Sequence, residues 1–79
     1  MIVAFVMAKV ESAKTRSVLE SVKKFEQVQE AYVIYGAYDL IIQGQFESPE
    51  ALSSFVVDEL RKIDGVKDTV TNVAASSAS

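Results

Sequence analysis

The chain contains no cysteine and no histidine. Without cysteine it has no disulfide and no thiolate nucleophile, and without histidine it lacks the commonest general base near neutral pH. The usual ligands of zinc and of redox metals are missing as well. We therefore predict no metal, no cofactor and no enzymatic activity.

Carboxylates and glycines do not supply an alternative chemistry. Five acidic residues of the second half are spread over a predicted helix and its flanks, without a recognisable pair: Glu47, Glu50, Asp58, Glu59 and Asp64. Two-carboxylate catalysis therefore has no specific support. The three glycines lie far apart, so the sequence also lacks a phosphate-binding glycine loop.

Positive charge and long apolar runs are scarce too. Eight Lys and Arg against eleven Asp and Glu give a formal net charge of −3, which argues against a nucleic-acid surface. The apolar start, Met1 to Met7, is far shorter than the roughly 20 residues of a membrane span and lacks the basic residues of a signal peptide. We expect a cytoplasmic protein that contacts neither a membrane nor, directly, nucleic acid.

The chain does have enough apolar residues for one small domain. Of its 79 residues, 49% are hydrophobic and 24% are charged, and we predict a folded domain over 1–75 with a short flexible tail at 76–79. A monomer of this size buries only about 60 to 65% of its unfolded surface. With no disulfide or metal to compensate, association with other copies is the expected source of added stability.

Four segments have the composition of strands. Ile2 to Val10 is a nearly continuous apolar run, which is typical of a strand covered on both faces. Val28 to Tyr35 and Asp39 to Phe46 are rich in β-branched and aromatic residues and are expected to form a hairpin around Gly36. Val66 to Ala74 is the predicted last strand.

Two helices are predicted between these strands. Apolar residues at helical spacing indicate the first one: Val18, Leu19, Val22 and Phe25. The second begins at Ser48 and Pro49, where a hydroxyl cap precedes a proline at the first helical position, and its apolar stripe ends at Ile63. Gly65 is predicted to be the left-handed cap that ends this helix.

The order β-α-β-β-α-β predicts an α+β, ferredoxin-like domain, with a four-stranded antiparallel sheet and both helices on one face. The other face of the sheet has no helix, yet the first strand is apolar on both sides. We infer that this open face packs on a second copy of the chain, most simply in a two-fold dimer.

The candidate functional residues lie in three short pieces: Tyr35 to Leu40, Asp64 to Val66, and Thr69 to Thr71. These pieces resemble the effector-binding module of the Lrp/AsnC transcription regulators, the RAM domain. The likeness extends from Val3 to Val73 and rests on Gly36, Tyr38, Asp39, Leu40, Leu52, Phe55, Leu60, Ile63, Gly65, Val66, Thr69 and Thr71. Full regulators of this family carry an N-terminal helix-turn-helix, whereas Met1 here stands on the first strand, so the resemblance is to a stand-alone form.

The resemblance implies dimers that assemble into a ring, often an octamer, and bind an amino acid where the dimers meet. It places the effector against Gly36, Ala37, Tyr38, Asp39, Thr69 and Thr71. The chemistry is reasonable because an α-ammonium favours a carboxylate, while an α-carboxylate favours the N–H groups of a glycine turn and threonine hydroxyls. Asp64 and Asp68 are possible further acceptors.

The same residues also have purely structural interpretations. Asp39 can cap the hairpin turn through neighbouring N–H groups, and Gly36 can serve the turn alone. Thr69 and Thr71 are good strand formers, and the three tyrosines are typical of buried interfaces.

Two function classes therefore remain open. One is an amino-acid-sensing oligomer that acts through protein partners, including full-length Lrp/AsnC regulators with which it can co-assemble. The other is a structural or protein-interaction module that binds no ligand. The fold does not decide between them, because RNA-recognition motifs, ACT domains, dimeric monooxygenases and metal chaperones share it.

Overall fold

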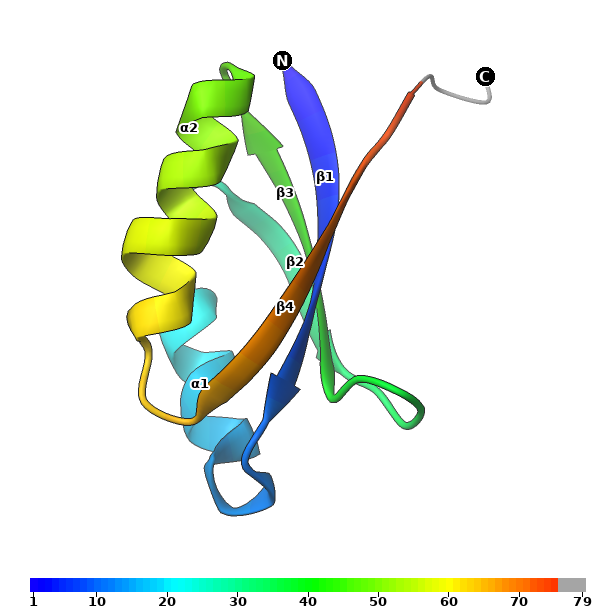
Figure 1. The fold of residues 1–79 in the computed structure, drawn as a ribbon, viewed down its shortest axis with the longest axis vertical. Coiled ribbons are helices and arrows are strands. Elements are labelled where there is room, and N and C mark those ends of the chain that lie inside the picture. Colours follow the sequence, from blue (N-terminus) through cyan, green and yellow to red (C-terminus); the bar gives the residue numbers. More distant parts are fainter. Residues whose placement is uncertain (76–79) are drawn as a thin grey trace.

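A computed structural model describes residues 1–75 of the chain. Four strands form one antiparallel sheet in the order β2-β3-β1-β4 (Figure 1). One helix connects β1 to β2 and the other connects β3 to β4. The elements are β1 (Ile2–Val10), α1 (Thr15–Val22), β2 (Val28–Val33), β3 (Leu40–Phe46), α2 (Pro49–Ser54) and β4 (Val66–Val73). This arrangement confirms the predicted ferredoxin-like fold. The predicted tail at 76–79 lies outside the described residues.

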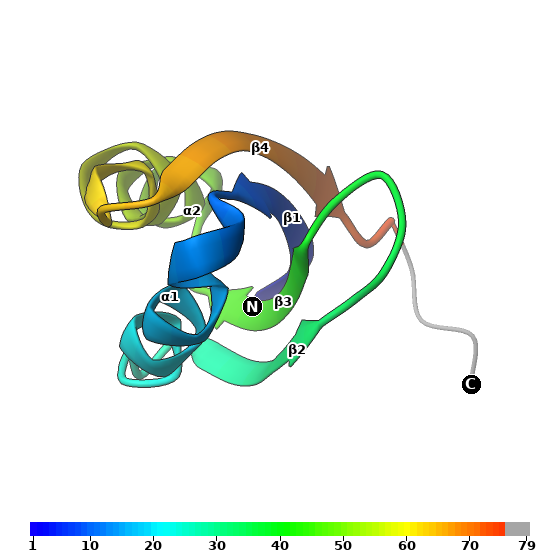
Figure 2. The ribbon, with the colours of Figure 1, turned by 90° about the horizontal axis from the view of Figure 1, so that it is seen from below.

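Both helices cover the same face of the sheet (Figure 2). Alternate residues of β1 and β3 point into this layer and are buried: Ala4, Val6, Ala8, Val10, Leu40, Ile42 and Phe46. The helical side completes the packing with Val18 and Val22 of α1, Leu52 of α2, and Phe55, Val56 and Leu60 in the turns that follow α2. The opposite face, called the open face below, has no helix among residues 1–75, as the sequence predicts.

The second helical segment changes its pitch along its length. Ser48 caps it as predicted, since its Oγ accepts a hydrogen bond of 3.0 Å from the Ala51 amide. The segment is α-helical to Ser54, π-helical over Phe55–Glu59 and 3-10 helical over Leu60–Lys62. The apolar spacing does not reveal these changes, because one wide or tight turn shifts the stripe only slightly. None of the helices in residues 1–75 is long and apolar enough to cross a membrane.

Gly65 has the predicted positive φ, +104°, but it is not a helix cap. The helical segment ends at Lys62, and Ile63 is already extended. The Val66 amide donates to the Ile63 carbonyl over 3.2 Å, which makes Gly65 the third residue of a β-turn, where a positive φ favours glycine. The Glu11 amide donates to the Gly65 carbonyl over 2.9 Å, so this turn is tied to the end of β1.

Gly44 is a close-packing site that the sequence analysis did not single out. A Cβ atom there would lie 2.9 Å from Cε2 of Phe46 and 3.0 Å from the Gln27 carbonyl oxygen. Phe46 is fully buried, and the Gln27 carbonyl accepts a bond from the Gln45 amide, so neither neighbour moves freely.

We predict that Gly44→Ala lowers the free energy of unfolding by about 1 to 3 kcal/mol, because the new methyl group overpacks the core. Urea denaturation measures this change. Gly36→Ala is the matched control, since a Cβ atom on Gly36 has no neighbour within 4 Å and only its φ of +156° opposes the substitution. An equal or larger loss in the Gly36 variant would contradict the packing argument.

Candidate functional site

The hairpin loop, residues 34–39, is an exposed projection between β2 and β3. It is drawn in green in Figure 1 and extends away from both helices. Tyr35 is fully exposed and Gly36 has open space around it, while the Ile34 amide closes the loop with a 2.9 Å bond to the Asp39 carbonyl. β2 ends at Val33, earlier than predicted, and β3 begins at Leu40, later than predicted, so Tyr35 and Asp39 belong to the loop. Backbone N–H groups at the tip are therefore accessible to a ligand.

Asp39 fastens the base of this loop to β1. Its Oδ2 accepts a hydrogen bond of 2.8 Å from the Val10 amide, and its own amide donates to the Ala8 carbonyl over 2.9 Å. The carboxylate thus extends the β1–β3 ladder by one bond beyond the last paired residues, Ala8 and Leu40. Asp39 has a structural role, but its partner is a distant strand rather than the N–H groups of its own turn.

Tyr38 lies beside Lys9, a residue that the sequence analysis left unused. The Lys9 Nζ is 5.9 Å from the centre of the half-buried Tyr38 ring, within the range of a cation–π contact. Lys9 interrupts the apolar pattern at the end of β1, next to the start of β3. In a ferredoxin-like sheet the first and third strands pair, so the predicted fold itself was the available signal that a cation would lie near Tyr38 and Asp39.

Thr69 and Thr71 lie on a different part of the sheet. In the antiparallel register Thr69 is opposite Ala8 and Thr71 is opposite Val6, two residues of the helix-covered face. Thr71 accordingly lines a groove against the second helical segment, together with Pro49, Leu52, Ser53, Val56 and Val57. Because β1 separates β4 from β3, roughly 10 Å of sheet lies between the threonines and the hairpin. One chain does not bring the six predicted residues together.

The two further candidate acceptors already have partners. Asp64 Oδ2 is 2.8 Å from Lys14 Nζ, which is also 3.3 Å from Glu11 Oε2. The hydrogen bond that Lys14 donates to Asp64, followed by the one that it donates to Glu11, raises the pKa of Lys14. Asp68 Oδ1 accepts from the adjacent Thr69 amide over 2.9 Å.

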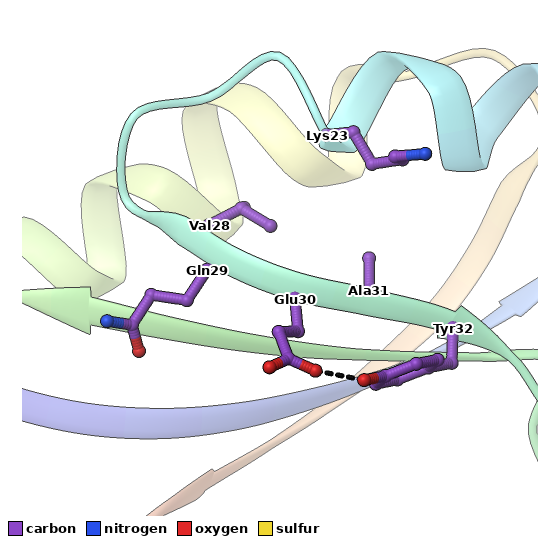
Figure 3. Close-up of a pocket in the computed structure, with 6 residues that line it drawn as sticks. All are labelled: Lys23, Val28, Gln29, Glu30, Ala31 and Tyr32. Atoms are coloured by element: carbon purple, nitrogen blue, oxygen red, sulfur yellow. Dashed lines mark hydrogen bonds between the residues drawn. The ribbon is translucent and has the colours of Figure 1, made fainter.

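A shallow depression along β2 does not include the predicted residues. It is lined by Lys23, Val28, Gln29, Glu30, Ala31 and Tyr32 (Figure 3). Ala31 points toward α1, whereas Glu30 and Tyr32 point away from it and are joined by a hydrogen bond that raises the pKa of Tyr32. This bond holds the Tyr32 ring over the open face.

Comparison with known families places these features in context. Residues 3–79 match the Lrp/AsnC ligand binding domain. The chain belongs to this family. An uncharacterised HTH-type transcriptional regulator of Pyrococcus horikoshii, PH0140, is 35% identical over 75 residues, which are 95% of this chain and 48% of that protein. The chain thus spans about half the length of the curated relatives that it matches.

Solved structures similar to this chain share the fold. The crystal structure of FFRP-DM1 superposes with a TM-score of 0.90 at 34% identity and covers 94% of this chain and 99% of its own. The complex of the Neisseria meningitidis transcriptional regulator NMB0573 with L-Met superposes with a TM-score of 0.90 at 26% identity. It covers 99% of this chain and 52% of its own. The curated relative and the L-Met complex are transcriptional regulators, and the part of this chain that resembles them matches a ligand-binding domain.

The contact between Asp39 and Val10 generates a stability prediction. Asp39→Ala leaves the part-buried Val10 amide without its acceptor and should lower the free energy of unfolding by about 1 to 3 kcal/mol. Asp39→Asn keeps a side-chain oxygen that can accept the same bond, so this variant should lose clearly less free energy of unfolding. Urea denaturation of both variants measures the difference. Equal losses would show that the negative charge, rather than the bond to Val10, stabilises the hairpin.

Proposed function

We propose that this domain binds an amino acid as the effector of an oligomeric, cytoplasmic regulatory module that acts on transcription through protein partners. The match to the Lrp/AsnC ligand binding domain over residues 3–79 is the observation that carries the proposal. The L-Met complex of a structural neighbour supports an amino acid as the class of ligand. The preferred amino acid is left to experiment.

The hairpin supplies the groups that such a ligand needs. Asp39 uses Oδ2 for Val10 and has no partner for Oδ1 among residues 1–75, so the second oxygen is available for an α-ammonium. The exposed backbone at Gly36 and Ala37 offers N–H groups for an α-carboxylate, and Tyr38 follows directly in the loop. A charge-assisted contact to Asp39 would be the strongest single interaction of this site.

The open face supports a dimer formed through the sheet. An apolar row crosses all four strands on this face, since Tyr32 pairs with Ile41, Ile41 with Met7, and Met7 with Val70. Tyr32 is 55% exposed in the isolated chain, and Phe5, one step along β1, is 37% exposed. Contiguous apolar surface of this kind is typical of protein interfaces.

Assembly beyond the dimer would complete the ligand site. Within one chain the threonines lie across β1 from the hairpin, so a pocket containing all six residues requires groups from more than one subunit. A ring of dimers, as the family resemblance implies, provides such junctions. Full-length Lrp/AsnC regulators with the same surfaces are the proposed partners, through which ligand binding would reach transcription.

A second candidate function is a structural interaction module without a ligand. The hydrogen bond between Asp39 and the Val10 amide favours it, because this bond accounts for the carboxylate without any effector.

We predict that Ile41→Lys breaks the dimer. The substitution places a charge in the middle of the apolar row, where burial on a second copy would strip it of water. Sedimentation velocity should show a shift to monomer for this variant. Val57→Lys is the matched control, because Val57 is 48% exposed and belongs to the helical side. If only the Val57 variant lost its assembly, the dimer interface would lie on the helical side and not on the open face.

We predict that the wild-type protein takes up a specific amino acid and that Asp39→Asn weakens this binding by about 1 to 3 kcal/mol while leaving the assembly intact. Native mass spectrometry with a panel of the twenty standard amino acids reports subunit number and bound mass together. Asp58→Asn, an exposed carboxylate of the second helical segment, controls for net charge. If the wild type assembles but binds none of the twenty, the structural module is the better account.

A further inference from the structure

Lys9 is a cation held between two aspartates that do not neutralise it. It is the last residue of the open face on β1, where Asp68 of β4 lies directly opposite. On the other side, Asp39 follows one residue beyond the last β1–β3 pair, Ala8 and Leu40. A surface lysine in this position would ordinarily pair with one of these carboxylates.

One oxygen of each carboxylate accepts a hydrogen bond from a backbone amide instead. Asp39 Oδ2 accepts from Val10 N, and Asp68 Oδ1 accepts from Thr69 N. Among residues 1–75 no carboxylate oxygen lies within 4.0 Å of the Lys9 Nζ. The ammonium lies over the Tyr38 ring instead, 5.9 Å from its centre.

This layout matches the charges of a free amino acid. In the β1–β3 register Lys9 stands opposite Asp39, one position beyond the pair Ala8 and Leu40, so the Lys9 side chain starts at the same end of the sheet as the carboxylate that would bind the α-ammonium group. The two protein charges lie at the same end of the sheet and do not form an ion pair, so the oppositely charged groups of a zwitterion can bridge them. A ligand that lacks one of these charges would leave a protein charge without its partner.

We propose that Lys9 binds the α-carboxylate of the effector and thereby makes the site selective for zwitterionic α-amino acids over amines and amides. This inference rests on the proposed function, because it assigns a further residue to the same site. The Tyr38 ring acts as a positioning group that holds the Lys9 side chain at the base of the hairpin.

The test compares amino acids with their α-carboxamides, which keep the ammonium group and lose the negative charge. The probes are the twenty standard L-amino acids and the carboxamides of those that bind, titrated calorimetrically at about pH 6, where the α-ammonium of the amide is still charged. The wild type should prefer the acid by about 10- to 100-fold, the range expected for one charge-assisted contact.

In the Lys9→Met variant the ratio of acid affinity to carboxamide affinity should fall toward one, because the acid binds more weakly and the carboxamide binds as before. Lys9→Arg should retain most of the preference, because it keeps a positive charge. Lys24→Met, beyond the end of α1, changes the net charge equally and should behave as the wild type. Thermal unfolding of each variant verifies that the fold is retained.

The possible results separate this proposal from the function on which it rests. Equal acid preference in Lys9→Met and Lys24→Met, with the wild type binding amino acids, overturns the role of Lys9 alone. Equal weakening of acid and amide by Lys9→Met also overturns it, because it indicates a loss of hairpin structure rather than of a carboxylate contact. A wild type that binds none of the twenty amino acids overturns the proposed function and the role of Lys9 with it.

Discussion

The two-sided apolar character of β1 is the constraint on which the rest of the structure depends. β1 is hydrogen-bonded to β3 on one side and to β4 on the other, so it lies within the sheet and not at its edge. One of its faces, with the small residues Ala4 and Ala8, is sealed by the helices. The other face carries Phe5 and Met7, which a single helical layer cannot cover. The same strand therefore fixes the core of the subunit and provides the surface for the proposed dimer.

The hairpin depends on β1 as well, through a side chain rather than through backbone pairing. Asp39 accepts a hydrogen bond from the Val10 amide just before β3 begins, and so fixes the last residue of the hairpin loop against the end of β1. A carboxylate has two oxygens, and this bond uses only one of them. The structural and ligand-binding interpretations of Asp39 are therefore compatible, and the structural bond orients the oxygen that a ligand would use. This is the way in which a rigid strand can preorganise a site on an exposed loop.

Local sequence features predicted most of the fold. The bounds of β1 follow from its apolar run, and the start of α2 follows from the Ser48 hydroxyl and Pro49. The errors lie where distant contacts decide the local structure. The apolar spacing predicts a helix end at Gly65 because it does not reveal the π and 3-10 turns that come before. The bond from Val10 to Asp39, and the position of Lys9 over Tyr38, depend on strand pairing between residues far apart in the chain, which no local pattern encodes.

The placement of the predicted site residues links assembly to ligand binding. If Thr69 and Thr71 contribute to the same pocket as the hairpin, they must do so from a neighbouring subunit, because β1 stands between the two groups in one chain. A ligand held by groups of two subunits binds the assembled form better than the separate one. By linkage it then stabilises the assembly by the same free energy with which assembly strengthens its binding. An effector signal of this kind requires no conformational change within the domain, since the number and arrangement of the subunits carry it.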